Sequence, residues 1–110
     1  MPPSSTFDDD DPETLYRTLI ASEPESPLPR FSLARLLVEA GRQAEAVEHL
    51  RFCVSKTADW AAAWLLLGDA LVATGATADA KQAYERCRAA SVVQHHESLA
   101  EEAEEKARAL

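Results

Sequence analysis

The sequence contains few of the residues that interrupt helices. Its 110 residues include three glycines and six prolines, and every proline lies at or before residue 29. Proline removes a backbone donor and glycine costs helix stability, so their scarcity after Arg30 leaves a long stretch open to helix formation. No segment shows the convincing apolar–polar alternation of a half-buried strand. The sequence therefore predicts an all-α protein.

Basic residues are also scarce. Eleven Lys and Arg against 19 Asp and Glu give a formal net charge of −8. Phosphate contacts require clustered cations, and so does binding to an anionic membrane surface. We therefore expect no nucleic-acid partner and no membrane partner. The run Asp8 to Asp11 lacks the alternating acids and central glycine of a calcium loop, which favours an acidic disordered tail over residues 1–10 and a helix cap.

Long apolar runs and a signal peptide are both lacking. The most apolar stretch, WAAAWLLLGDALVATG at 60–75, is interrupted by Asp69 and falls short of the roughly 20 residues that a bilayer span needs. The N-terminus lacks the basic and apolar regions of a secretory signal, so we expect a cytoplasmic protein. In that compartment Cys53 and Cys87 are expected to be small buried hydrophobes rather than a disulfide.

Recognisable catalytic motifs are absent as well. The sequence contains no nucleophile–base pair, phosphate-binding loop or metal-ligand spacing, so we expect no enzyme, no cofactor and no metal site. His95 and His96 adjoin Glu97, but neighbouring residues point to different sides of a helix. A solvated helix start is therefore favoured over a metal site there.

What the sequence does contain is helical periodicity. Six helices are predicted, over about 12–22, 29–40, 44–56, 61–74, 78–90 and 94–110. Asp10 or Asp11 is expected to cap the first helix ahead of Pro12. Gly41 and Gly75 are expected to end the second and fourth helices.

The predicted helices repeat with a period of 34 residues. Shifting the chain by this period superposes identical residues, namely Leu33 on Leu67, Leu37 on Leu71, Val38 on Val72, Gly41 on Gly75, Ala44 on Ala78, Ala46 on Ala80, and Cys53 on Cys87. Such a period indicates stacked helix pairs, each of which buries its apolar face against its neighbours.

These positions resemble the tetratricopeptide repeat, whose motif reads W-x2-L-G-x2-Y, then A-x3-F, then P. The second unit supplies Trp64, Leu67, Gly68, Leu71, Ala80 and Tyr84. The first unit supplies Arg30, Leu33, Ala34, Leu37, Ala46 and Leu50. Tyr16 and Pro24 fit the end of a truncated preceding repeat. Gly68 is expected to let a neighbouring helix approach closely.

The resemblance implies an α-solenoid of antiparallel helix pairs in a single domain over 11–110. A half repeat would span about 11–26, full repeats about 27–60 and 61–94, and a capping helix about 94–110. Ala58 and Val92 stand where the motif has proline, which predicts less sharply defined turns. Arg30 in the aromatic place predicts either a looser joint or a stem that packs on the N-terminal helix.

In this family the first helices of successive repeats line a concave groove for a peptide. Carried over by register, the groove residues are Phe31, Arg35, Val38, Glu39, Leu65, Asp69, Val72 and Ala73. The family's carboxylate clamp has no counterpart here, because its basic and amide places fall on Phe31, Arg35 and Leu66. Binding of acidic C-termini in the co-chaperone manner is therefore not supported.

The groove residues leave several interpretations open. Arg35 and Asp69, one repeat apart, could form an ion pair of small net value or could orient the polar groups of a peptide. Trp60 could cover the joint between repeats or anchor a partner. The resemblance implies a protein-interaction adaptor that binds an apolar segment of a protein or peptide partner. The alternative is a structural homodimer in which the groove is used for self-association.

Overall fold

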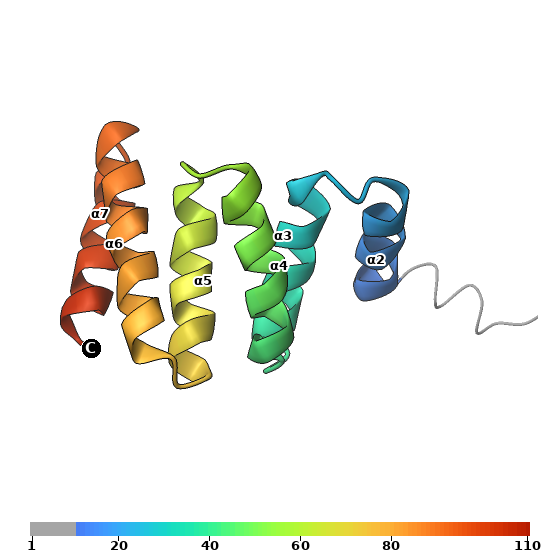
Figure 1. Cartoon of the computed structure of the whole chain (residues 1–110), viewed down its shortest axis with the longest axis horizontal. Helices are drawn as coiled ribbons and strands as arrows, with labels where there is room; N and C mark the ends of the chain where they lie inside the picture. The colour runs from blue at the N-terminus through green and yellow to red at the C-terminus, as the bar shows by residue number, and fades with distance from the viewer. Residues whose placement is uncertain (1–10) are drawn as a thin grey trace, which may run out of the picture.

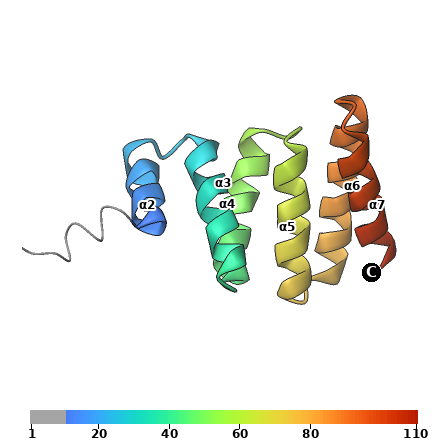
Figure 2. The same cartoon turned by 180° about the vertical axis from the view of Figure 1, so that it is seen from behind.

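Six antiparallel helices follow one another along the described part of the chain, which is elongated and measures 54 × 26 × 21 Å (Figure 1). The computed structural model describes residues 11–110, so the predicted acidic tail at 1–10 lies outside the described residues. The helices are α2 (Pro12–Ser22), α3 (Pro27–Glu39), α4 (Gln43–Lys56), α5 (Ala61–Ala73), α6 (Thr77–Val93) and α7 (Glu97–Arg108). The predicted all-α fold of six helices is confirmed, and both views place α2 and α7 at opposite ends (Figures 1 and 2).

The start of α2 and the ends of α3 and α5 contain the capping and helix-ending residues that the sequence predicts. The Asp11 side chain accepts a hydrogen bond from the backbone N–H of Glu13, and Pro12 occupies the first turn of α2. Gly41 and Gly75 adopt φ values of 80° and 85° directly after α3 and α5. This left-handed conformation closes each helix with a pair of backbone hydrogen bonds, because it turns the next N–H groups back onto the last carbonyls.

The end of α6 differs from the prediction. The helix runs on to Val93 rather than ending near residue 90, because no proline at Val92 stops it. His95 then takes the left-handed place with φ 62°, and the N–H of His96 donates to the carbonyl of Ser91 at 2.8 Å. As a result α7 begins at Glu97 rather than at residue 94. At the other end of the chain, α3 begins at Pro27, two residues before its predicted start.

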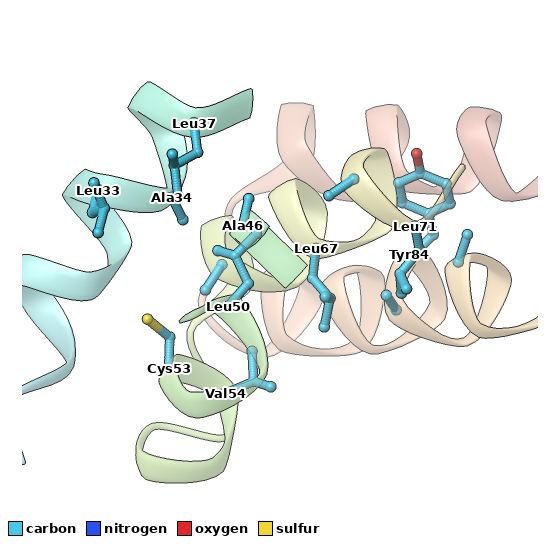
Figure 3. Packing of buried hydrophobic residues seen from close by; sticks show 14 residues of the cluster. Leu33, Ala34, Leu37, Ala46, Leu50, Cys53, Val54, Leu67, Leu71 and Tyr84 are labelled. Carbon is cyan, nitrogen blue, oxygen red and sulfur yellow. The ribbon is translucent and has the colours of Figure 1, made fainter. Parts of the chain in front are cut away.

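The core is built from the motif leucines and small residues of the repeats. Leu33, Leu37 and Leu50 are fully buried, and Leu67 is 2% exposed (Figure 3). Full burial of each such side chain is worth about 1.5–3 kcal/mol. A second buried cluster, with Ala61, Cys87 and Ala103, joins α5 and α6 to α7. Both cysteines are buried as free thiols, as expected.

Gly68 allows α5 and α6 to approach closely, as expected. A Cβ atom at this position would lie 2.4 Å from Cε1 of Tyr84, closer than any real contact. The Tyr84 ring therefore rests on the bare backbone of α5. Its hydroxyl donates to the Asp69 carboxylate at 2.6 Å, which fixes the ring in this place.

The guanidinium of Arg30 lies against α4 and the turn that follows α2. Its guanidinium carbon lies 4.2 Å from the centroid of the Phe52 ring on α4, within cation–π distance. One nitrogen of the same group lies 3.5 Å from Nδ1 of His49, and another donates to the carbonyl of Pro24 at 3.4 Å. His49 is consequently half-buried beside Arg30.

Four alternating charges attach α2 to the rest of the molecule. Arg17 contacts Glu13 at 2.8 Å and Glu45 at 2.6 Å, while Arg42 contacts the same two carboxylates at 2.8 and 2.9 Å. Hydrogen bonds from Arg42 and Arg17 lower the pKa of Glu13. Those from Arg17 and Arg42 also lower the pKa of Glu45, against the opposing effect of burial.

Within residues 11–110, no helix combines the length and apolar character that a bilayer crossing requires.

Candidate functional site

A hollow of about 290 Å³ lies between α3 and α5, the first helices of the two full repeats. It is lined by Phe31, Arg35, Ala62, Leu65, Leu66 and Asp69. Four of these residues, Phe31, Arg35, Leu65 and Asp69, belong to the predicted groove. Repeat register therefore brought residues 34 positions apart to one surface, because α3 and α5 present equivalent faces in the same direction.

The remaining predicted groove residues lie around this hollow rather than in it. Val38 is half-buried and packs against the main core. Glu39 lines a separate hollow of about 310 Å³ between α2 and α3, which Arg35 also borders. Val72, at 41% exposure, and Ala73 lie in the last turn of α5, exposed to solvent. Whether these residues bind a partner stays a prediction.

Asp69 does not pair with Arg35. Its carboxylate instead accepts hydrogen bonds from the Tyr84 hydroxyl and from Nζ of Lys106 on α7, the latter at 2.9 and 3.1 Å. Lys106 also contacts Glu102 at 3.0 Å. Burial disfavours the ammonium, but the hydrogen bonds to Asp69 and Glu102 outweigh it and raise the pKa of Lys106. The charge of Asp69 is thus already compensated within the molecule.

Lys106 was missed by the sequence reasoning. It follows a run of glutamates in α7, where it reads as one more surface charge. The 34-residue register stops at the end of α6, so it could not align α7 with α5. The available signal was the Ala100–Ala103–Ala107 stripe, which fixes the inner side of α7 and leaves Lys106 at its edge.

Arg35 is the basic side chain that lines this hollow. It is exposed and makes no hydrogen bond or ion pair within residues 11–110, while it borders both the α3–α5 and the α2–α3 hollows. Of the two charged residues predicted to lie one repeat apart, Arg35 is therefore available to a ligand and Asp69 is not.

Phe31 and Trp60 form an aromatic wall at one end of the hollow. Their ring centroids lie 4.5 Å apart with the planes tilted by 35°, so Trp60 covers the joint between the repeats. Beyond this wall lies a larger hollow of about 930 Å³ at the starts of α3, α5 and α7. It shares Ala62 with the smaller hollow and includes Leu28, Leu99 and His95. Sequence reasoning did not find it, because the α6–α7 turn that forms one side departs from the repeat.

The chemistry available at this surface is non-covalent recognition. Apolar and aromatic side chains line most of the α3–α5 hollow, with one uncompensated guanidinium at its rim. No group of three or more His, Cys, Asp or Glu side chains in the described part of the chain is arranged to hold a metal ion.

The comparisons with known proteins agree on one family. The model of the tetratricopeptide repeat-like domain matches residues 13–105. A TPR repeat-containing protein of Pseudomonas aeruginosa is 38% identical over 68 residues, which cover 62% of this chain. The match spans 65% of that relative, slightly less than two thirds of its length.

Solved structures show the same fold. The first TPR of Spaghetti (RPAP3), bound to the HSP90 peptide SRMEEVD, matches 96% of this chain and 82% of its own with a TM-score of 0.75 and 18% identity. MamA matches 84% of this chain and 62% of its own with a TM-score of 0.65 and 20% identity. At these identities the likeness concerns the fold alone. By its repeat register, its helix packing and the family match over most of its length, the chain belongs to the tetratricopeptide repeat-like family.

Proposed function

We propose that this protein is a protein-interaction module that binds an apolar peptide segment in the groove between α3 and α5, without catalysis. The observation that supports this role is the α3–α5 hollow itself. Phe31, Leu65 and Leu66 offer apolar contact area there, and Arg35 stands uncompensated at the rim. Concave apolar surfaces with a few placed polar groups are the usual form of a binding site.

The apolar side chains would supply most of the binding free energy. Burying one leucine or phenylalanine of a ligand contributes about 1.5–3 kcal/mol, against several kcal/mol of lost translational, rotational and side-chain freedom. The small hollow alone therefore gives weak affinity. A segment that also reaches the larger hollow past Trp60 would bury more area, since the two hollows share Ala62.

Arg35 would set the orientation of the segment. Because Lys106 and Tyr84 already compensate Asp69, the groove presents one free cation on a protein of net charge −8. A carboxylate or a backbone carbonyl of the ligand is the group that this guanidinium binds best. The Spaghetti (RPAP3) structure, bound to a peptide, supports peptide recognition by this fold.

The experiment uses peptides selected from a displayed random library and then synthesised with a fluorescent label. Arg35→Ala should weaken binding about three- to tenfold, as for a hydrogen bond to a charged group, and should leave the unfolding midpoint unchanged, because Arg35 makes no bond within the described fold. Arg51→Ala, on α4 outside the hollow, is the matched control. Equal affinity for wild type and Arg35→Ala would count against the orienting role.

Leu65→Glu tests the apolar part of the groove. We expect at least a tenfold loss of affinity, while circular dichroism stays helical. Leu65 also packs against both buried clusters, so the thermal midpoint must be measured alongside binding. Val93→Glu, at a position that is 79% exposed, gives the matched change outside the hollow. Light scattering at micromolar concentration would reveal a dimer that Leu65→Glu dissociates, which would assign the groove to self-association instead.

A further inference from the structure

Helix α2 occupies the place of the second helix in a repeat. The 34-residue register aligns Tyr16 with Leu50 and Tyr84, and Leu19 with Cys53 and Cys87. In α4 and α6 these residues are 0–3% exposed. In α2 no residue is fully buried, Leu19 is 39% exposed and Leu15 is 49% exposed. One apolar side of α2 therefore lacks the cover that its counterparts have.

The two full repeats show what provides that cover. In the second repeat, Gly68 and Asp69 of α5 lie against the Tyr84 ring and hydroxyl. In the first repeat, the Cys53 thiol donates to the Pro27 carbonyl of α3 at 3.3 Å. In both cases the covering element is the first helix of the same repeat. Among the described residues, no helix takes this position beside α2.

A hollow lies in the corresponding position. It measures about 310 Å³ and is lined by Pro12 and Tyr16 of α2 and by Ser32, Arg35, Leu36 and Glu39 of α3. Pro12 aligns with Ala46 and Ala80, both fully buried in their own repeats. The space beside α2 and α3 thus corresponds to the position that α3 fills beside α4 and that α5 fills beside α6.

We propose that Pro12, Leu15, Tyr16 and Leu19, together called the α2 face, are the docking site for an amphipathic α-helix of a partner protein. The register of the repeat defines the chemistry of that helix. It would carry leucines at three- and four-residue spacing and a small residue opposite Tyr16, as α3 and α5 do with Ala34 and Gly68. Apart from Arg35, which borders both hollows, the proposal does not involve the residues of the α3–α5 groove.

The charges near the α2 face agree with an apolar occupant. Arg17 and Glu13, the charged side chains of α2, are bound to each other and to Arg42 and Glu45. The α2 face itself carries no charge. A helix that presents leucines to the α2 face would therefore bury no unpaired charge of α2, and its polar side would meet Arg35 and Glu39 of α3 across the hollow.

A second copy of the chain fits this position less well. The two buried clusters use most of the apolar side chains of α3 to α7, apart from those that line the α3–α5 hollow or lie singly on the surface, and the outer side of α7 presents several glutamates. Two α2 helices could pair, but each has 11 residues and a length of about 16 Å. Such a contact buries much less than the roughly 1,200 Å² of a stable interface.

The test uses a fluorescein-labelled synthetic peptide of residues 27–42, PLPRFSLARLLVEAGR, which is a first helix of the required pattern. We expect saturable binding to the full chain, observed as an increase in anisotropy. Leu19→Glu should weaken it at least tenfold. Ala21→Glu should change it less than twofold, because Ala21 is exposed on the opposite side of α2. A peptide with Leu33→Asp and Leu37→Asp should not bind.

Further outcomes decide against the proposal. No saturable binding, or equal affinity for wild type and Leu19→Glu, would overturn it. So would loss of binding in Leu65→Glu with none in Leu19→Glu, because the peptide would then occupy the groove. If Leu19→Glu lowers the helical content, Leu15→Glu replaces it, at a position that is more exposed. A concentration-dependent dimer that Leu19→Glu dissociates would assign the α2 face to a second copy.

Discussion

The two full repeats contain the same side-chain interactions with the partners exchanged. In the first repeat, Arg30 on the first helix lies over Phe52 on the second at 4.2 Å. In the second repeat the equivalent positions hold Trp64 and Arg86, and the guanidinium lies 5.6 Å from the indole ring. The cation lies on the first helix of the first repeat and on the second helix of the second repeat, and each repeat contains one such cation–aromatic pair.

The same positions also contribute the same hydrogen bond. Arg30 donates to the carbonyl of Pro24 at 3.4 Å, and Trp64 donates through its indole N–H to the carbonyl of Ala58 at 2.8 Å. Each side chain therefore secures the turn that precedes its repeat. Arginine can replace the family's aromatic here because it combines an N–H donor with a flat group that stacks on a ring.

The sizes of two facing side chains also differ between the repeats in a complementary way. The first repeat has Ala34 and Leu50 where the second has Gly68 and Tyr84. All four are buried, and the larger ring is accommodated because the opposing residue has lost its Cβ. The repeat thus fixes where two side chains meet and requires only that they be complementary in size or charge.

Gly68→Ala should have the largest effect on this arrangement. The new Cβ would overlap the Tyr84 ring, which its hydrogen bond to Asp69 holds in place. Overpacking costs about 1–3 kcal/mol, and the gain of about 1 kcal/mol in helix propensity offsets part of it. Since a separation of 2.4 Å places the overpacking at the upper end of that range, we expect a net loss of about 2 kcal/mol in the free energy of unfolding, measured by urea denaturation.

The double variant Gly68→Ala with Tyr84→Leu sharpens this result. It recreates the Ala–Leu pair of the first repeat, so its loss of stability should be smaller than the sum of the two single losses. Strict additivity would show that the two positions are not complementary in the way the repeats indicate.

The exchanged cation–π pairs should differ in strength. Phe52→Leu removes the ring that lies 4.2 Å from the guanidinium carbon of a partly buried arginine, and should cost about 1 kcal/mol. Arg86→Met keeps the aliphatic stem but removes a more distant, exposed cation, and should cost about 0.5 kcal/mol. Equal losses in chemical denaturation would mean that the geometry of the pair does not determine its contribution.

The sequence predicted the parts of the fold that the repeat defines. Seven identities at a fixed shift, together with Gly41 and Gly75, located the helices of both repeats and the shared surface of Phe31 and Leu65. These predictions succeeded because leucine burial and left-handed glycine turns are local consequences of residue type. The pairing of Arg30 with Phe52 was also visible, as the reverse of Trp64 and Arg86, but it required comparing pairs rather than single positions.

The parts that depend on departures from the repeat were not predicted. Without a proline at Val92, α6 extends to Val93, and this moves the start of α7. The position of Lys106 beside Asp69 follows from that shift and from helix packing, neither of which the 34-residue register contains. The sequence therefore predicted Arg35 and Asp69 as an ion pair or as a pair that orients a peptide, whereas Asp69 is bound by Lys106 and Arg35 makes no hydrogen bond or ion pair within residues 11–110.

Lys106→Gln tests why the two repeats differ in the groove. Position 35 of the first repeat has a free cation, while Asp69 at the equivalent position is bound by α7. Because Lys106 and Asp69 are each about one third exposed, the loss should be small, about 0.5 kcal/mol, and should diminish at high salt. Urea denaturation at two salt concentrations measures it. No loss at low salt would show that the ion pair does not help to hold α7.

The smallest expected difference between the repeats is in the pH dependence of stability, to which His49 of the first repeat contributes. The equivalent position of the second repeat is Ala83, which does not titrate. Burial, followed by the nearby charge of Arg30, lowers the pKa of His49 below its usual value near 6.5, although Glu45 and Glu48 oppose the shift. The unfolded chain therefore binds a proton more readily than the folded one in this range.

The sign of the pH dependence follows from this difference. The contribution of His49 to stability is complete above pH 6.5 and is lost as the pH falls from there through the folded-state pKa. Glu13 and Glu45 have pKa values lowered from 4.5, so their own losses begin at more acidic pH. The free energy of unfolding should thus decrease by a few tenths of a kcal/mol between pH 7.5 and 5.5. His49→Gln should remove that decrease, and an unchanged slope in the variant would exclude His49 as its source.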